Sequence, residues 1–233
     1  MIELKNISFA YQDVYILNDI TLTLESNKIY GLIGKNGVGK TTLLKVLSRY
    51  INTNNGNIII DGISINHTDF LDTNIAYVFD ECICFNELTF VEHLILIAKS
   101  SGLSKESCMR FIHSFIMNLD LDKYKNNYPN TLSKGTLQRL NIGMGLIRHA
   151  SYLLMDEPFN GLDPVQTTNC IALIKNYQKE VKNTIIISSH QLENLSTLCD
   201  DYLIMTSSGI LKIQKDQINE KDIIEMLSHD TVD

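Results

Sequence analysis

The sequence predicts an α/β fold built on a largely parallel sheet, with helices on both faces. The chain has 233 residues, enough for one domain with a sizeable core, and 44% of them are hydrophobic. Short apolar runs of strand character alternate with helical stretches, as in α/β proteins. Only 12 glycines and 3 prolines occur, too few for a fold of many short strands. The apolar content and the 20% of charged residues exclude disorder as the main character.

The first part of the chain is expected to form strands. Period-two alternation at Ile20–Leu24 and a short apolar run at 28–33 indicate a half-buried strand and a buried one. In order, the predicted elements are strands within 1–33, a helix from Thr41 to Tyr50, a hairpin within 51–66 around Ile58–Ile60, and a strand at 75–79. An antiparallel β part therefore precedes the main sheet.

A helical lobe is predicted between two strand-bearing parts, because apolar residues recur at spacings of three and four from Thr89 to about Arg148. The elements expected after it are strand 152–155, helix 164–180, strand 184–188, helix 191–199, strands 202–206 and 210–214, and helix 218–227. We expect one domain over 1–233, with its core in 1–81 and 149–233 and the inserted helical lobe at about 82–148.

The net charge, the cysteines and the hydropathy of the chain disfavour several kinds of function. The formal charge of −7 disfavours a nucleic-acid groove, since phosphate backbones are usually bound by a basic excess. Five cysteines without a C-x-x-C pair indicate reduced thiols in a cytosolic protein. Buried structural cysteines are favoured over a metal site of Cys82 and Cys84 with His93 or His113. No signal peptide is expected, and no apolar run approaches the roughly 18 residues of a membrane-spanning helix.

A phosphate-binding loop is predicted where the buried run at 28–33 meets the first helix. Gly34-Lys35-Asn36-Gly37-Val38-Gly39-Lys40-Thr41 fits the pattern G-x-x-x-x-G-K-[ST]. Glycines let backbone N–H groups wrap an anion, and the helix N-terminus adds positive potential. Lys40 supplies charge for the β- and γ-phosphates, and the Thr41 hydroxyl suits Mg²⁺. We expect the nucleotide to be bound by the whole loop and by Thr42, which follows it.

Two carboxylates end the apolar strand Tyr152–Met155. A carboxylate at the tip of a buried strand beside a phosphate loop is suited to Mg²⁺, and Asp156 occupies that position. Glu157 would face the γ-phosphate and act as a general base or orient the attacking water. We therefore expect Asp156 to be a metal ligand and Glu157 to be catalytic.

These motifs and three further segments resemble the ATP-binding-cassette ATPases, the nucleotide-binding subunits of ABC transporters, over nearly the whole chain. Leu132-Ser133-Lys134-Gly135-Thr136 is similar to the family signature LSGGQ, with Lys134 and Thr136 as departures. Gly161-Leu162-Asp163-Pro164 is similar to the dimer-contact loop. Ile185–His190 resembles the strand that ends in the switch histidine, and Tyr11 lies where the family stacks an aromatic ring on adenine.

The resemblance implies a P-loop NTPase fold with a RecA-like core, and an ATPase that uses ATP and Mg²⁺. Two cassettes would pair head to tail as a homo- or heterodimer, with Ser133 and Gly135 of one meeting the γ-phosphate bound by the other. Glu157 would polarise water and His190 would contact the γ-phosphate. Mg²⁺ would lie between Thr41 and Asp156.

Asp80 departs from the family pattern, because it occupies the position of a glutamine that touches Mg²⁺ and the lytic water. A carboxylate can still bind Mg²⁺, so Asp80 is a third candidate metal ligand. It also places negative charge near the γ-phosphate and cannot donate a hydrogen bond to water. We expect slower or more partner-dependent hydrolysis.

The resemblance further implies a separate transmembrane permease, docked on the helical lobe beside Asp80 and near Phe85–Leu88, with the chain peripheral on the cytoplasmic face of the membrane. Compact length and the LSKG signature favour export of a peptide, antibiotic or similar compound. Two alternatives stay open. One is a cassette ATPase without a transporter, and the other is a nucleotide-dependent regulator that hydrolyses weakly.

Overall fold

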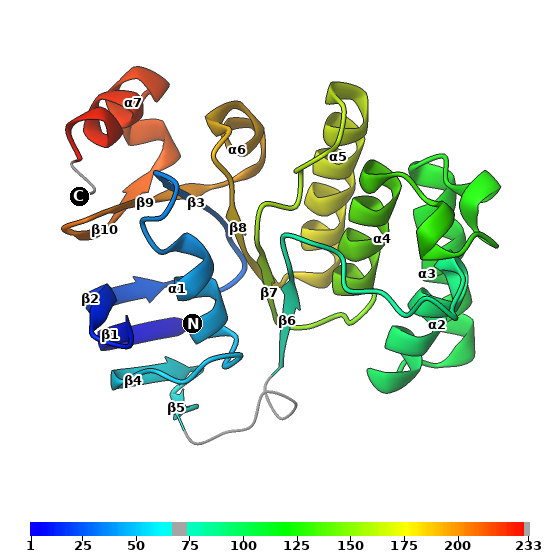
Figure 1. The fold of residues 1–233 in the computed structure, drawn as a ribbon, viewed down its shortest axis with the longest axis horizontal. Helices are drawn as coiled ribbons and strands as arrows, with labels where there is room; N and C mark the ends of the chain where they lie inside the picture. Colours follow the sequence, from blue (N-terminus) through cyan, green and yellow to red (C-terminus); the bar gives the residue numbers. More distant parts are fainter. Residues whose placement is uncertain (67–73, 231–233) are drawn as a thin grey trace.

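An antiparallel sheet forms the N-terminal part of the molecule (Figure 1). The computed structural model describes residues 1–66 and 74–230. The strands of this sheet are β1 (Ile2–Tyr11), β2 (Val14–Leu24), β4 (Asn55–Ile60) and β5 (Ile63–Ser64), in the order β2-β1-β4-β5. The hairpin expected within 51–66 is confirmed, because β4 and β5 pair across the turn at Asp61 and Gly62.

The second sheet has six strands in the order β10-β9-β3-β8-β7-β6. They are β3 (Ile29–Gly34), β6 (Ile75–Val78), β7 (Tyr152–Met155), β8 (Thr184–Ser188), β9 (Asp201–Thr206) and β10 (Gly209–Gln214). All its neighbours pair in parallel except β9 and β10. The predicted largely parallel sheet is confirmed, and the carboxyl ends of β3, β6, β7 and β8 share one edge.

The helices divide into two groups along the chain. Helices α2 (Phe90–Ser100), α3 (Lys105–Asn118) and α4 (Lys134–Leu146) lie between β6 and β7 in sequence, at the end of the molecule far from α7 (Figure 1). The others are α1 (Lys40–Leu47), α5 (Pro164–Val181), α6 (Leu192–Leu198) and α7 (Glu220–His229). Short 3₁₀ helices occur at Asp122–Tyr124, Pro129–Thr131 and Lys215–Gln217. None of the helices in the described part of the chain has the length and apolar character that crossing a membrane requires.

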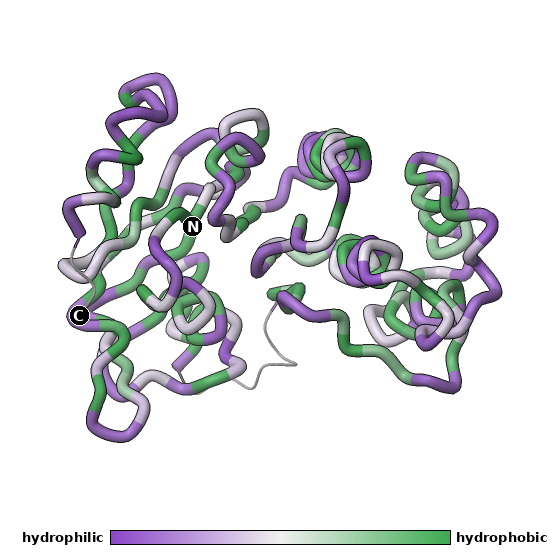
Figure 2. The backbone as a smooth tube through the Cα atoms, turned by 45° about the horizontal axis from the view of Figure 1, so that its top comes forward, coloured by the Kyte–Doolittle hydropathy of each residue, from purple (hydrophilic) through white to green (hydrophobic). Residues whose placement is uncertain are grey.

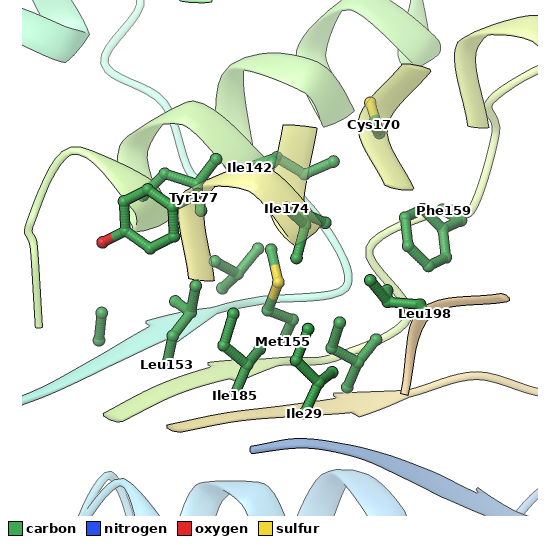
Figure 3. Close-up of a cluster of buried hydrophobic side chains, with 14 of the residues drawn as sticks. Ile29, Ile142, Leu153, Met155, Phe159, Cys170, Ile174, Tyr177, Ile185 and Leu198 are labelled. Carbon is green, nitrogen blue, oxygen red and sulfur yellow. The ribbon is translucent and has the colours of Figure 1, made fainter. Parts of the chain in front are cut away.

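Apolar side chains cover both faces of the six-stranded sheet. Successive residues of a strand point to opposite faces, so Ile185 and Ile187 join one buried cluster while Ile186 joins the other. Figure 3 shows Ile185 and Leu153 beneath Ile142 of α4 and Ile174 of α5. In Figure 2 the helices show hydrophilic and hydrophobic stretches in turn along the tube. The helices between β6 and β7 therefore share one core with the sheet.

Two predicted helix boundaries were wrong, each for a local reason. The first helix ends at Leu47 and not at Tyr50, because Arg49 adopts a left-handed φ of 62° and Tyr50 N donates back to Lys45 O over 2.9 Å. The stretch predicted to be helical from Thr89 to about Arg148 contains three α-helices, with Gly102 at φ 75° after the first. The last helix begins at Glu220, where the Asn219 side chain caps Asp222 N.

Candidate active site

A hollow of about 410 Å³ lies at the shared carboxyl edge of the parallel strands. Five segments far apart in sequence supply its walls, namely β2, the loop after β3, and the residues that follow β6, β7 and β8. Its lining residues are Ile16, Asn36, Gly37, Gly39, Lys40, Thr41, Thr42, Asp80, Asp156, Glu157, Asn160 and His190. A ligand in the hollow would therefore meet the phosphate loop and the carboxylates together.

The loop between β3 and α1 has the backbone that its glycines predict. Gly39 adopts a left-handed φ of 110°, and an added Cβ would lie 2.9 Å from Ile16 Cγ2, so a larger residue would be both strained and obstructed. Gly39 precedes α1, and no side chain caps the first turn of that helix. The N–H groups of that turn lie at the hollow, and a helix N-terminus of this kind favours an anion.

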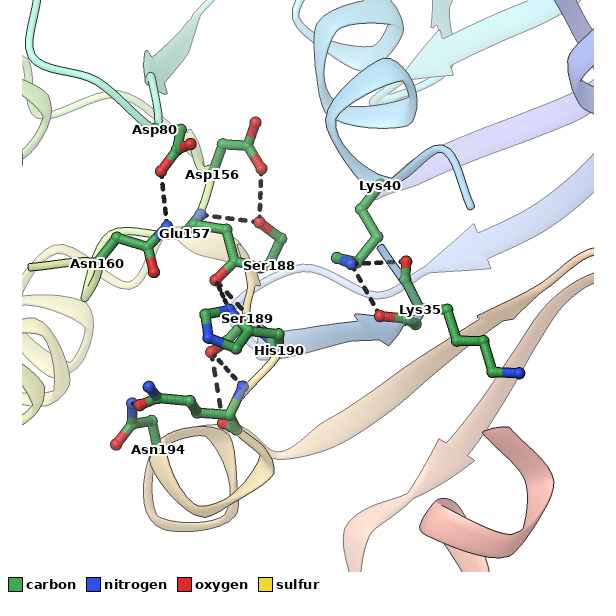
Figure 4. Close-up of polar contacts among 12 residues, drawn as sticks. Lys35, Lys40, Asp80, Asp156, Glu157, Asn160, Ser188, Ser189, His190 and Asn194 are labelled. Carbon is green, nitrogen blue, oxygen red and sulfur yellow. Dashed lines mark hydrogen bonds and ion pairs between the residues drawn. The ribbon is translucent and has the colours of Figure 1, made fainter. Parts of the chain in front are cut away.

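Lys40 lies folded against its own loop (Figure 4). Its Nζ donates to Gly34 O over 2.8 Å and to Lys35 O over 3.1 Å, and the residue is only 7% exposed. Burial lowers the pKa of Lys40, while the charges of Glu157 and Asp156 act in the opposite direction. Lys40 thus lines the same hollow as both carboxylates, within the loop that would receive phosphates.

Asp156 is held by hydrogen bonds from two neighbouring strands. The Ser188 hydroxyl of β8 donates to Asp156 Oδ1 over 2.7 Å, and the Tyr77 hydroxyl of β6 donates to Oδ2 over 3.2 Å. Asp156 is 1% exposed, so these donors offset part of the cost of burying its charge. Ser188 Oγ also accepts from Glu157 N over 2.9 Å, which links the two acidic residues.

Glu157 and His190 form a direct pair (Figure 4). His190 Nδ1 lies 2.9 Å from Glu157 Oε2, and the backbone N–H of His190 donates to the same oxygen over 3.3 Å. A carboxylate oxygen only accepts, so the imidazole carries its proton on Nδ1 in this contact. Glu157 is also unusual in its backbone, with a left-handed φ of 45°.

Asp80 reaches the hollow from the end of β6. The side-chain amide of Asn160 donates to Asp80 Oδ1 over 2.8 Å. One residue earlier, Phe79 O accepts from Asn141 Nδ2 of α4 over 2.7 Å. The segment that carries Asp80 is therefore bonded to Asn160 at the hollow and to Asn141 of α4.

Six residues that were predicted to bind nucleotide are not among the residues that line the hollow. The Lys35 side chain runs toward α7 (Figure 4). It contacts the main-chain oxygen of Asp230, and Val38 is buried in the core. Gly34 offers its carbonyl to Lys40. Tyr11 is 49% exposed and packs edge-on against Phe9. Ser133 and Gly135 lie at the start of α4, where Ser133 Oγ accepts from Thr136 N over 3.2 Å.

Four residues of the site were missed from the sequence. Ile16 and Asn160 line the hollow, while Ser188 and Tyr77 hold Asp156. Ser188 could have been found by placing the ends of two adjacent parallel strands side by side. Asn160 and Ile16 carry no comparable signal, because the turn after Glu157 and the tip of the antiparallel sheet reach the hollow only through the tertiary fold.

The fold and this site define a P-loop nucleotide-binding protein of the α/β class. Residues 17–160 match the ABC transporter family model. The chain is 30% identical to the methionine import ATP-binding protein MetN 1 of Enterococcus faecalis, over 98% of this chain and 69% of that protein. It is 28% identical to the ABC-type transporter ATP-binding protein EcsA of Bacillus subtilis, over 95% of this chain and 92% of that protein.

Solved structures agree with the sequence comparison. A structure of an ATP-binding subunit of an ABC transporter matches with a TM-score of 0.88 and 25% identity, covering 98% of this chain and 99% of the other. The dimeric cassette MJ0796, bound to ADP and Pi, has the same fold with a TM-score of 0.81 at 21% identity, over 92% of this chain and 99% of the other. The chain thus belongs to the ABC transporter family, as one of its ATP-binding ATPase subunits.

Proposed function

We propose that this chain hydrolyses ATP with Mg²⁺ in the hollow and thereby drives transport through a separate membrane partner. One observation carries the proposal: a single hollow joins the phosphate loop and Lys40 to Asp80, Asp156 and the Glu157–His190 pair. On binding, the β- and γ-phosphates would replace Gly34 O and Lys35 O as partners of Lys40 Nζ. The exchange gives Lys40 a charged partner in a desolvated site.

The oxygen groups of the hollow fit a magnesium ion. The Thr41 hydroxyl and the Asp80 and Asp156 carboxylates line it, and hard oxygen ligands suit Mg²⁺. No group of three His, Cys, Asp or Glu side chains in residues 1–66 and 74–230 forms a complete metal cage. That agrees with an ion bound by one or two carboxylates and by the nucleotide phosphates. When bound, Mg²⁺ would neutralise charge on the phosphates.

Glu157 is proposed to take the proton of the attacking water. Its Oε2 accepts two hydrogen bonds from His190, which orient the carboxylate toward the hollow. His190 is 47% exposed at its side chain, so its other nitrogen is available to a γ-phosphate oxygen or to a second subunit. In this proposal Glu157 is the base and His190 both positions it and senses the phosphate.

The second half of each site is proposed to come from another cassette. Ser133 and Gly135 are not among the residues that line the hollow of their own chain. Their position at the start of α4 gives a helix N-terminus that could meet a γ-phosphate across a head-to-tail dimer. The dimeric form of the structurally similar MJ0796 cassette supports an assembly of this kind.

A groove of about 320 Å³ supports docking of a membrane partner. It lies where α1 and β6 meet α2 and α4, and we call it the partner groove. Its lining residues are Arg49, Tyr50, Tyr77, Phe79, Ile83, Ile97, Asn141, Met144, Gly145 and Arg148. Its largely apolar walls suit the apolar face of an amphipathic helix of a transmembrane protein. Tyr77 belongs to this groove and also donates to Asp156, so the groove and the site share a residue.

The direction and cargo of transport are the least constrained part of the proposal. Export of a peptide, antibiotic or similar compound stays a prediction, because similar proteins include methionine import subunits as well as EcsA. In the proposal, the membrane partner selects the cargo and this chain supplies the energy. A location at the inner face of the membrane follows from binding to that partner.

The test is to co-express the chain with a membrane protein encoded by a neighbouring gene, if that gene predicts about six spanning helices, purify both through a tag on that protein, and measure ATP hydrolysis. We expect wild type to co-purify and hydrolyse ATP, and Lys40→Ala to co-purify without hydrolysis. Ile83→Asp, in the partner groove, should fail to co-purify, whereas Ile63→Asp, 69% exposed on β5, should co-purify normally. Equal recovery of both aspartate variants would contradict the groove assignment.

A further inference from the structure

Two cysteines flank Ile83 in the segment between β6 and α2. The Sγ atoms of Cys82 and Cys84 lie 3.0 Å apart and share a hydrogen bond. Both residues are half-buried, whereas Cys108, Cys170 and Cys199 are buried. The expectation of buried structural cysteines is therefore wrong for this pair. Two thiols in contact and partly open to solvent form a candidate site for thiol chemistry.

The fold holds the pair in place through the first turn of α2. Phe85 N donates to His93 Nε2 over 2.9 Å, and His93 Nδ1 donates to Thr89 O over 2.8 Å. The Phe85 and His93 rings also stack, with centroids 6.3 Å apart. At the other end, the bond from Asn141 to Phe79 O anchors the segment to α4. The backbone is thus held at Phe79 and at Phe85, a few residues before and after the two cysteines, and this keeps the two thiols facing each other.

The same contacts activate one sulfur. The hydrogen bond from Cys82 lowers the pKa of Cys84, with a further contribution from His93. A thiolate is the reactive form of cysteine, and a partly exposed one reacts with disulfides. Both nitrogens of His93 are already hydrogen-bonded, so His93 supports the pair without being a free metal ligand.

We propose that Cys82 and Cys84 form a reversible thiol–disulfide site that is oxidised by low-molecular-weight disulfides. The Cys84 thiolate attacks one sulfur of the disulfide, which breaks the S–S bond and releases one thiolate. Cys82 then loses its proton to solvent and attacks Cys84 Sγ, releasing the second thiol. Two cysteine thiols are oxidised and one external disulfide is reduced to two thiols. The sulfurs need to approach only from 3.0 Å to a bond of about 2.05 Å.

The consequence rests on the proposed function, because Ile83 lines the partner groove. A bond between Cys82 and Cys84 closes a small ring around Ile83 and fixes its backbone. Oxidation therefore changes the groove wall that a membrane partner would contact, four residues or fewer from Asp80. A partly exposed disulfide of this kind is readily reduced again, as in transient cytosolic disulfides that sense redox state.

Peptide mapping tests the chemistry by itself. The purified full chain is treated with oxidised glutathione, free thiols are alkylated with iodoacetamide, and the protein is digested with trypsin. Residues 50–99 form one tryptic peptide, because Arg49 and Lys99 flank it with no Lys or Arg between them, and it holds no cysteine other than Cys82 and Cys84. We expect this peptide to be two hydrogen atoms lighter than its reduced form and not to be alkylated.

Single variants resolve the order of the steps. Cys82→Ser should retain glutathione on Cys84, since no second thiol is left to displace it. Cys84→Ser should leave Cys82 largely alkylated. A wild-type peptide that is alkylated at both cysteines after oxidation would overturn the site.

Partner binding tests the consequence separately. Oxidised wild type should lose co-purification with the membrane protein and regain it after dithiothreitol, whereas Cys82→Ser/Cys84→Ser should be indifferent to oxidant. A disulfide that forms without changing co-purification would overturn the regulatory role alone. Failure of the reduced protein to co-purify would count against the proposed function and leave the peptide result standing.

Discussion

Asn160 donates a 2.8 Å hydrogen bond to the Asp80 carboxylate and so joins the segments after β7 and β6 across the hollow. The family resemblance implies a glutamine at the position of Asp80, and a carboxylate there adds negative charge beside the expected γ-phosphate. The Asn160 amide offsets part of that charge. Through Phe79, the same segment is bonded to Asn141 of α4, which also lines the partner groove.

Asp80→Gln should raise the ATPase rate. The substitution removes a negative charge from the hollow and adds an amide that can donate to the attacking water, while its carbonyl oxygen can still accept from Asn160. We expect an increase of about tenfold, equivalent to about 1.4 kcal/mol of activation free energy. Steady-state ATP hydrolysis at saturating Mg²⁺ measures it. A clear loss of activity would show that the carboxylate is itself required.

Glu157→Gln should separate binding from hydrolysis. The amide keeps the size of the side chain but cannot take a proton, and removal of a general base typically costs about 10²- to 10⁴-fold in rate. ATP binding should persist, and ATP should accumulate a dimer detectable by analytical ultracentrifugation. The exposed acid Glu193 on α6 provides the control, since Glu193→Gln should behave as wild type. Hydrolysis by Glu157→Gln at the wild-type rate would refute the assignment of the base.

Gly135→Ala should destabilise the isolated subunit, apart from any effect between subunits. An added Cβ would lie 2.9 Å from Gly161 O and from Gln166 Oε1, which is closer than carbon atoms approach such oxygens. Overpacking of this kind typically costs about 1–3 kcal/mol in the free energy of unfolding. Urea denaturation measures it. Adding Gln166→Ala should recover part of the loss, because one of the two obstructing atoms is then removed.

Glu25 should contribute to the acid sensitivity of the fold. Lys212 Nζ donates to Glu25 Oε1 over 2.8 Å and the Tyr30 hydroxyl donates to Oε2 over 2.7 Å. These contacts lower the pKa of Glu25 from 4.5 to about 2. A lowered folded-state pKa gives stabilisation that is complete above about 4.5 and is lost as the pH falls toward 2.

Glu25→Gln should therefore flatten the loss of stability with pH in that window and leave the slope at neutral pH unchanged. The effect should be small, because the Glu25 side chain is 52% exposed and solvent screens its ion pair. Unfolding free energies at several pH values between about 2 and 6 measure it. An identical pH profile for the variant and wild type would contradict a role for Glu25.

Local chemistry explains which features could be predicted. The loop around Gly39 and Lys40 was predictable because left-handed glycines and a helix N-terminus are encoded in adjacent residues. Asp156 and Glu157 were predictable because they end a buried strand. Strand order was not encoded locally, so Ser188 emerged as the partner of Asp156 only once β7 and β8 were paired.

One glycine and one lysine show what a sequence motif cannot predict. Gly135 was predicted from a signature that faces a second subunit, yet within one chain it also lets α4 approach Gly161 and Gln166. Lys35 belongs to the phosphate-loop pattern, but its side chain is directed to the carbonyl of Asp230, nearly two hundred residues later. Contacts at such separations depend on the assembled fold.

The left-handed backbone of Glu157, with φ at 45°, places activity and stability in opposition at one residue. A side chain with a Cβ pays a conformational penalty there, typically of about 1–3 kcal/mol. Glycine or asparagine would relieve it, so selection for folding alone would favour their appearance at this position. In the proposed mechanism the glutamate at this strained position is needed for its carboxylate. Glu157→Gly should therefore relieve the backbone penalty and at the same time remove the base.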